Sequence, residues 1–313
     1  MSRDKKAQKD NTNIANEFNQ DELSSLGSQC YDLFQDDDES RSEWKERHQD
    51  YLEVYHQLDS YEVSFRESDD SRIPLLTESC LGFQARAYKA LFPQRSFVAT
   101  TSMEDITPEE VERSERVAKW MNYQLNFRQR RYKRDKKRML LAAALMGNDF
   151  TKTYWCPMLN IPKVERVRAQ DFVVSQGKGP RELEDIRRKT QIIYMDINRA
   201  RQLHRAGFFT QLPEIDQNND YTGMQQVEAD AEGINYNVVQ DSTMVKILEQ
   251  HTWYDLDGDG IEEPVIFWID DNSKKVLRVS ARFNVNDENK TPIEYYTYYS
   301  FIDNPDGFWC FGS

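Results

Sequence analysis

The segment RIPLLTESCLGFQARAYKALFP, residues 72–93, is apolar around most of its circumference when it is wound as a helix. Pro74 suits the first turn of a helix, and Pro93 ends it because the residue before a proline avoids helical geometry. The apolar side chains that share one face at helical spacing are Leu76, Cys80, Phe83, Ala87, Ala90 and Leu91, widened by Leu81, Tyr88 and Phe92. We expect a helix that requires protein on most sides, either in a domain core or between domains or subunits.

The rest of the chain is hydrophilic. Of its 313 residues, 38% are apolar and 30% are charged, which is typical of one large globular domain or two of ordinary size. No run approaches the roughly eighteen apolar residues of a membrane helix, and the N-terminus MSRDKKAQKD lacks the features of a signal peptide, so we expect a soluble protein without a membrane partner. The cysteines are widely spaced and the histidines show no metal-binding spacing, which predicts neither disulfides nor a zinc site.

The net charge of −13 is concentrated near the N-terminus. Residues 1–70 hold 19 Asp or Glu against 8 Lys or Arg, whereas the remainder is nearly neutral. Residues 1–40 are also rich in Asn, Gln and Ser, so we predict a flexible acidic and polar arm that buries too little apolar surface to order itself. This acidity argues against general wrapping of nucleic acid by the chain.

Residues 41–147 carry helical patterns. Thr107, Pro108 and Glu110 form a capping-box signature that begins one of the helices. Near residues 126–131 the sequence allows either a turn between two antiparallel helices or one long helix. We therefore predict a helical region over residues 41–147.

Residues 148–313 are β-rich. The alternating segments FTKTYWCP and KVERVRA flank the turn MLNIP, and later strand patterns are separated by DGDG and DDNSKK. NRARQLHRAG predicts a short helix, one of one or two in this region, and residues 211–241 form a long polar excursion. The predicted fold class is α+β, with a helical N-terminal part followed by an antiparallel β-rich part.

The strongest metal-binding pattern is YDLDGDGIEEP. Asp255, Asp257 and Asp259 occupy alternate positions and Glu263 follows, which matches the front of a calcium loop. Position twelve would be Ile266 instead of the usual glutamate. We expect either bound Ca²⁺ or Mg²⁺, or a tight acidic turn that uses Asp and Gly for their local conformations. The sequence predicts no other cofactor.

A second charged pattern is the basic tract, the eight cations of RQRRYKRDKKR. They are Arg128, Arg130, Arg131, Lys133, Arg134, Lys136, Lys137 and Arg138. Such a tract contacts nucleic-acid phosphates, forms a solvated helix surface whose stems cover apolar neighbours, or pairs with the acidic N-terminal part of this or an adjacent subunit. The charge run alone does not choose among these three interpretations.

Catalytic signatures are lacking, because the chain contains no GxxxxGK[ST], GxGxxG or GxSxG. We therefore predict that the protein is not an enzyme. The alternative is a metal-dependent DNA-processing enzyme built on the aspartates of the YDLDGDGIEEP turn.

Six segments follow one another along the chain: PLLTESCLGFQARAYKALFP, MNYQL, GNDFTKTYWCP, AQDFVV, LEQHTWYDLDGDGIEEP and YYSFIDNPDGF. In order and spacing they resemble the N-terminal part of portal (head–tail connector) proteins of tailed bacteriophages, most of all the long portals of short-tailed phages. The resemblance runs from about Arg41 to the end of the chain.

The resemblance implies the wing of a ring protein, usually of twelve subunits, at one capsid vertex of the virion. It implies assembly in the host cytoplasm and roles in DNA packaging and ejection. The implied partners are further copies of the chain, the major capsid and scaffolding proteins, the terminase, tail or adaptor proteins, and double-stranded DNA bound without sequence specificity. It also implies that Phe83, Arg86 and Tyr88 lie on a helix packed within the wing or against a neighbouring subunit. The family's stem and clip would follow Ser313, so we expect a wing portion, or alternatively a smaller head–tail adaptor.

Overall fold

The computed structural model describes most of the chain. The residues it describes are 13–58, 73–93, 97–100, 107–156, 160–176, 182–215, 223–233, 243–256, 258–284, 287, 289–305 and 307–312. The α+β class is confirmed, since helices predominate first and two antiparallel sheets follow.

The chain divides into two compact units, each built from two separate parts of the sequence. Unit 1 comprises Met1–Glu53 and Ala169–Glu294, and unit 2 comprises Val54–Arg168 and Tyr295–Ser313. These boundaries differ from the predicted ones at residues 40 and 147, because each unit combines helices with strands that are distant in sequence.

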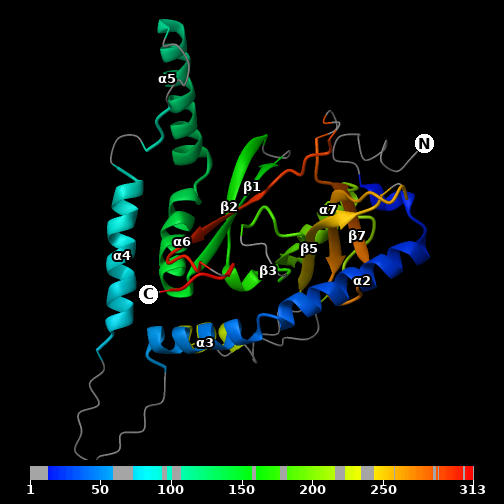
Figure 1. The fold of residues 1–313 in the computed structure, drawn as a ribbon, viewed down its shortest axis with the longest axis horizontal. Helices are drawn as coiled ribbons and strands as arrows, with labels where there is room; N and C mark the ends of the chain where they lie inside the picture. The colour runs from blue at the N-terminus through cyan, green and yellow to red at the C-terminus, as the bar shows by residue number, and fades with distance from the viewer. Residues whose placement is uncertain are drawn as a thin grey trace, which may run out of the picture. The chain divides into compact units, whose positions relative to one another are not determined.

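Unit 1 is organised around a five-stranded antiparallel sheet in the order β3-β4-β5-β6-β7 (Figure 1). The strands are β3 (Phe172–Val174), β4 (Lys189–Asp196), β5 (Met244–Tyr254), β6 (Glu263–Asp270) and β7 (Val276–Ala281). The central strand β5 pairs Leu248 with Ile192 on one side and with Ile269 on the other. Cross-strand apolar neighbours of this kind give the sheet a continuous apolar face.

Helix α2 (Gln20–Glu39) covers that apolar face, so the prediction of a flexible arm over residues 1–40 is wrong for this part. Asn19 and Glu22 form a reciprocal capping box that fixes where the helix begins. Leu26, Cys30 and Phe34, at helical spacing, pack into the core of the sheet. The apolar stripe is narrow, so the average composition of the segment conceals it. Residues 1–12 lie outside the described residues.

α2 approaches the sheet closely at Gly27. A Cβ atom at this position would lie 2.0 Å from the backbone oxygen of Lys274, so only glycine fits without a shift of backbone. Beyond α2, the chain continues into helix α3 (Ser42–His56).

The other face of the unit 1 sheet packs against helix α7 (Ile197–Arg205). Ile197 and Ala200 contact Val245 and Ile247 there. The predicted polar excursion over residues 211–241 contains a helix instead, α8 (Gly223–Glu232), which buries Met224, Val227 and Ala229. Its three apolar anchors lie among many polar residues, so composition again concealed it.

Unit 2 contains a three-stranded antiparallel sheet in the order β2-β1-β8. Its strands are β1 (Asn148–Cys156), β2 (Ile161–Val167) and β8 (Tyr296–Ser300). The β1–β2 hairpin confirms the predicted alternation around MLNIP. Phe150 of β1 is fully buried between Val167 and Tyr298 on its two neighbours.

The helices of unit 2 are α4 (Leu75–Leu91), α5 (Pro108–Tyr123), the π-helical segment η2 (Gln124–Arg128) and α6 (Tyr132–Met146). α4 lies beside α6, and the side chain of Gln84 donates a 2.8 Å hydrogen bond to the Lys137 carbonyl. α5, η2 and α6 follow one another along nearly one line in Figure 1, interrupted by a turn, so they are not an antiparallel pair. Within the described residues, no helix combines the length and apolar character needed to cross a membrane.

Candidate functional site

Helix α5 of unit 2 buries none of its residues. Its start is the capping box predicted from the sequence, with Thr107 and Glu110 bonded reciprocally. Its apolar side chains and the aromatic residue that follows in η2 lie at the surface, with 37–68% of their area exposed. They are Val111, Val117, Trp120, Met121, Tyr123 and Phe127, and we call them the α5 apolar face.

This face continues into a groove beside residues 97–100. Asn122 fixes the groove: its Nδ2 donates to the Val98 carbonyl at 2.8 Å, and its Oδ1 accepts from the amides of Phe97 and Val98 at 3.3 Å. Thr100 Oγ1 donates to the Ser114 carbonyl at 2.6 Å. The groove has a volume of about 770 Å³ and is lined in part by Tyr123 and by the apolar face residue of η2.

The basic tract divides into two groups. Six of its side chains are exposed and form no ion pair with the residues that the structure describes: Arg128, Arg130, Arg131, Arg134, Lys137 and Arg138, which we call the basic surface. Lys133 is half-buried over the rings of Phe92 and Phe97, 5.9 and 5.4 Å from their centroids. The solvated-surface interpretation therefore describes Lys133, whereas the six exposed cations are available to an anionic partner.

Lys136, the remaining cation of the tract, is buried in unit 2. Its Nζ donates to the Tyr299 hydroxyl at 2.7 Å and lies 4.2 Å from the centroid of that ring. Burial raises the pKa of Tyr299, but hydrogen bonds from Lys136 and Thr151 outweigh it and lower that pKa below its usual value. Lys136 thus stabilises the interior of unit 2 and is not a surface contact.

A buried carboxylate lies close to this lysine. Asp149 is fully buried, and its Oδ2 lies 2.5 Å from Arg166 Nε. Burial raises the pKa of Asp149 to about 6, even though Arg166 and Lys136 act in the opposite direction. The desolvation of the Asp149 carboxylate therefore raises its pKa by more than the ion pair with Arg166 lowers it.

The three α4 residues that were predicted to pack a subunit lie in different environments. Phe83 is half-buried and meets Phe301 edge-on at a centroid distance of 4.8 Å, and Tyr88 contacts the ring of Phe92 at 5.0 Å. Arg86 is exposed and donates to the Gly82 carbonyl of its own helix. Phe83 and Tyr88 thus make internal contacts of unit 2.

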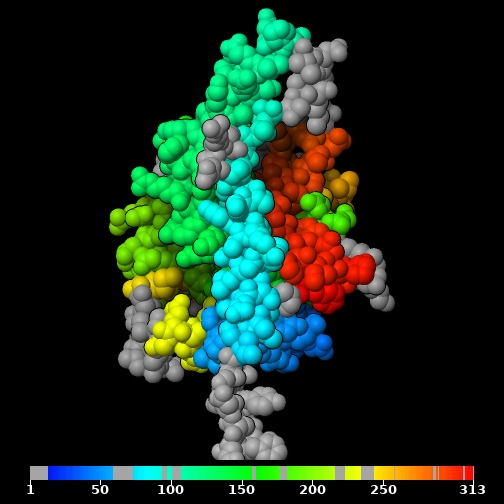
Figure 2. Space-filling view, turned by 90° about the vertical axis from the view of Figure 1, so that its left-hand side faces the viewer, coloured from blue at the N-terminus to red at the C-terminus, as the bar shows by residue number. Residues whose placement is uncertain are grey.

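The opposite side of α4 is more exposed than expected. Figure 2 shows the cyan surface of α4 uncovered along most of the helix. Leu75, Leu81 and Leu91 are 66%, 44% and 49% exposed. We predicted a helix that contacts protein on most of its sides. Among the described residues of the chain, only one side of α4 is in contact with protein.

The acidic turn after β5 uses its carboxylates internally. Asp255 accepts hydrogen bonds from the Gly258 amide at 2.6 Å and from the Gly260 amide at 2.9 Å. Both glycines have φ near +80°, the left-handed region that favours glycine. Asp259 accepts from the amide two residues later at 2.7 Å. This geometry matches the turn interpretation, and Asp257 lies outside the described residues.

Glu263, the fourth predicted metal ligand, is 1% exposed. One carboxylate oxygen accepts from the Leu256 amide at 2.9 Å, and the other lies 2.8 Å from Lys290 Nζ. Among the described residues, no group of three or more His, Cys, Asp or Glu side chains is placed to hold a metal ion. Asp255, Asp259 and Glu263 instead tie the turn to its flanking strands.

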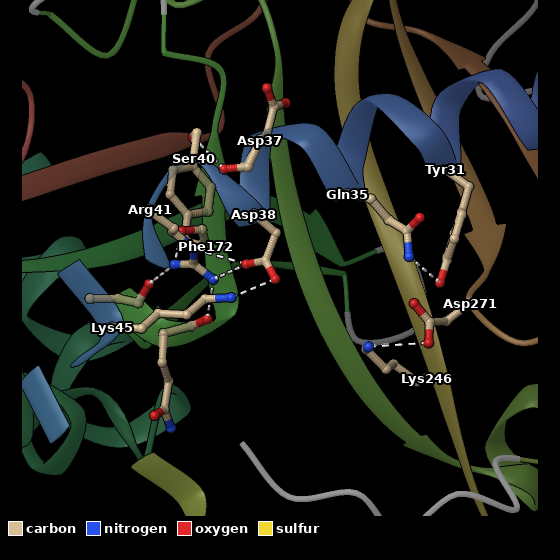
Figure 3. Close-up of polar contacts among 12 residues, drawn as sticks. Tyr31, Gln35, Asp37, Asp38, Ser40, Arg41, Lys45, Phe172, Lys246 and Asp271 are labelled. Carbon is tan, nitrogen blue, oxygen red and sulfur yellow. Dashed lines mark hydrogen bonds and ion pairs between the residues drawn. The ribbon is translucent and has the colours of Figure 1, made fainter. Parts of the chain in front are cut away.

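Unit 1 contains a charged pocket of about 390 Å³ at the junction of α2 and α3, shown in Figure 3. Arg41, 3% exposed, anchors one side of it. Its Nη1 donates to the carbonyls of Ala169 and Phe172 at 3.1 and 3.0 Å, and its Nη2 donates to the Gln170 carbonyl at 2.8 Å. Its Nε donates to Asp38 at 2.9 Å. Arg41 therefore joins the α2–α3 junction to the turn before β3.

Two further ion pairs line the pocket. Asp38 also binds Lys45 at 2.6 Å, and Lys246 binds Asp271 at 3.1 Å. Burial raises the pKa of Asp38, but its two cationic neighbours outweigh this and lower it. Burial lowers the pKa of Lys246, but Asp271 outweighs this and raises it. These ion pairs join α2 to α3 and β5 to the residue after β6, so they hold the fold together. No sequence pattern indicated this pocket, because its residues come from distant segments.

No known protein-family model matches this chain, and no curated protein sequence is significantly similar to it.

Proposed function

We propose that this chain is a ring-forming structural protein of the portal type, located at one capsid vertex, through which double-stranded DNA is packaged and ejected. The proposal includes docking of the terminase and of the tail, and contact with the capsid and scaffolding proteins, as the resemblance implies. The protein itself would carry out no chemistry, and DNA movement would be driven by a separate motor.

The observation that carries the proposal is the α5 apolar face. The 16-residue helix α5 has no buried residue, Trp120 on it is 53% exposed, and Phe127 in the following η2 is 68% exposed, so this part of unit 2 leaves large apolar side chains uncovered. Several large exposed apolar side chains on one helix indicate a surface that associates with protein. A ring requires each subunit to present two different surfaces to its two neighbours, and this face supplies one of them.

The order of the six segments that resemble portals gives further support. The first segment forms α4, the second spans the end of α5 and η2, and the third forms β1. The remaining three include β3, the β5–β6 turn and β8. The resemblance therefore runs through the main helices and both sheets, as expected for a whole wing region.

The metal-dependent enzyme has less support. The amides of Gly258 and Gly260 occupy both carboxylate oxygens of Asp255, and Glu263 is buried in an ion pair with Lys290. A metal would have to displace these hydrogen bonds before it could activate water. The smaller head–tail adaptor remains the second candidate, because it would use the same apolar face to oligomerise.

Sedimentation velocity of the purified chain over a range of concentrations tests the proposal. We expect the fraction of assembled chain to rise with concentration, and we expect Trp120→Asp to move the equilibrium toward the monomer, since it places a charge within the buried contact. Ile261→Asp is the matched control, because Ile261 is 69% exposed in the acidic turn of unit 1. A wild-type chain that stays monomeric at every concentration contradicts the proposal.

A further inference from the structure

The basic surface of unit 2 presents a regular ladder of cations. Arg131, Arg134 and Arg138 lie three and then four residues apart and are all exposed. At 1.5 Å rise per residue, this spacing places one cation on each successive helical turn along one side of α6. The ladder begins at the residue that caps α6.

These cations lie where a helix disfavours them. The N-terminal end of a helix carries the positive end of its dipole, so cations in the first turn are destabilising and anions are stabilising. α6 begins with Arg131 as its cap and holds Lys133 and Arg134 in its first turn, with Asp135 as the acidic residue there. An anionic partner would offset both the helix dipole and the mutual repulsion of the cations.

Unit 1 carries a surface of opposite charge on α2 and α3. Six carboxylates there are exposed and form no ion pair within the part of the chain that the structure describes: Asp32, Asp36, Glu39, Glu43, Glu46 and Asp50, which we call the acidic surface. Arg47 is the exposed cation among them. Glu43, Glu46 and Asp50 lie three and then four residues apart, the same spacing as the cation ladder of α6.

Each charged surface also borders exposed apolar area. Phe127, 68% exposed, precedes the basic surface, and Tyr51, 40% exposed, follows the last carboxylate of the acidic surface. Apolar area next to complementary charge is typical of contacts between proteins. A nucleic acid would match the cations alone and would also be repelled by the net charge of −13.

We infer that the basic surface of one copy binds the acidic surface of a second copy, with the α6 ladder lying along the α3 ladder. This inference rests on the proposed self-association and assigns the polar part of the contact between copies to these two surfaces. The two surfaces differ, so the contact is heterologous and repeats from copy to copy, as ring closure requires. Exposed ion pairs are screened by salt, so the assembly weakens as ionic strength rises.

Charge reversal in two variants tests the contact. Variant B carries Arg131→Glu, Arg134→Glu and Arg138→Glu, and variant A carries Glu43→Lys, Glu46→Lys and Asp50→Lys. In sedimentation velocity we expect each variant to raise the dissociation constant about tenfold or more, because three attractive pairs become repulsive. A chain with all six changes restores complementary charges between copies, so we expect it to assemble nearly as the wild type does.

The control is a reversal of equal size elsewhere in the chain. Arg199→Glu, Arg201→Glu and Arg205→Glu change three exposed cations of α7, and we expect the assembly to remain unchanged. Circular dichroism of every variant shows whether it is folded.

Three outcomes separate the possibilities. Loss in A and in B with recovery in the six-fold variant supports the contact. Assembly of the wild type with no effect of A or B overturns the contact but leaves the proposed function intact, whereas a monomeric wild type contradicts the proposed function itself. If B loses salt-dependent affinity for duplex DNA while both A and B still assemble, the basic surface binds nucleic acid and the inference is wrong.

Discussion

Replacing Arg41 by alanine tests how unit 1 is held together. The side chain is 3% exposed and donates four hydrogen bonds, three of them to the backbone carbonyls of residues 169, 170 and 172. Removing one partner of a buried, hydrogen-bonded charge costs about 3–5 kcal/mol, because the remaining groups lose their partners in a poorly solvated place. The pocket beside Arg41 admits water to the freed carbonyls, so we expect the lower value, about 3 kcal/mol.

Amide hydrogen exchange measures this loss within unit 1 and does not require the whole chain to unfold in one step. We expect the amides of α2 and of residues 169–174 to exchange roughly a hundredfold faster in Arg41→Ala than in the wild type, which is the factor that corresponds to about 3 kcal/mol. Arg41→Lys retains the charge but loses the planar fork, so we expect a smaller increase in the same peptides.

The control is Arg47→Ala, which removes an exposed arginine of the adjoining helix α3. Its removal should change the free energy of unfolding by less than about 0.5 kcal/mol. If Arg41→Ala accelerates exchange no more than Arg47→Ala does, then Arg41 does not anchor the α2–α3 junction and the reasoning is refuted.

Three further predictions concern single side chains. Because burial raises the pKa of Asp149 to about 6, the folded chain retains a proton that the unfolded chain has lost above about pH 4. The contribution of Asp149 to stability is therefore full at low pH and falls by about 3 kcal/mol as the pH rises through 6. Asp149→Asn should flatten that part of the pH–stability curve, and an unchanged slope would contradict the prediction. Gly27→Ala should destabilise unit 1 by about 1–3 kcal/mol, because the added Cβ would meet the backbone oxygen of Lys274. Gly82→Ala is the control: its Cβ would have no atom within 4 Å, so it should stabilise α4 by up to about 1 kcal/mol. Equal changes of melting temperature in the two variants would refute the close approach at Gly27. Asp255→Ala should lower the free energy of unfolding by about 1–2 kcal/mol, because the amides of Gly258 and Gly260 lose their acceptor. Millimolar calcium should not raise the melting temperature of the wild type, and a calcium-induced rise would instead favour a metal-binding loop.

Features encoded locally could be predicted from the sequence. The capping box of α5, the β1–β2 hairpin and the end of α4 before Pro93 each depend on residues a few positions apart, and all three are confirmed. The α+β class follows from such local patterns, since each element shows its own periodicity.

Features that depend on distant partners could not be predicted. α2 is ordered because Leu26, Cys30 and Phe34 meet a sheet built from residues more than 100 positions later. β8 pairs with β1, which lies about 150 positions earlier, and so joins the sheet of unit 2. The charged pocket around Arg41 depends on the same long-range assembly. Local pattern identifies an apolar stripe, but the surface that covers it is set by the whole fold.

The sequence predicted the helix α5, but it did not predict that the apolar side chains of this helix are exposed. Val117, Trp120 and Met121 recur at helical spacing, and the sequence contains no signal that distinguishes a core inside one chain from a contact between chains. Trp120, 53% exposed, shows the difference only once the structure is known.

Native mass spectrometry of the purified chain distinguishes a closed ring from a monomer. We expect one closed assembly whose mass is a fixed multiple of the 37.1 kDa chain, with the twelve copies that the resemblance to portals implies, and we expect Trp120→Asp to abolish it. A spectrum that contains only the 37.1 kDa species at every concentration, in the wild type as in the variant, would contradict it.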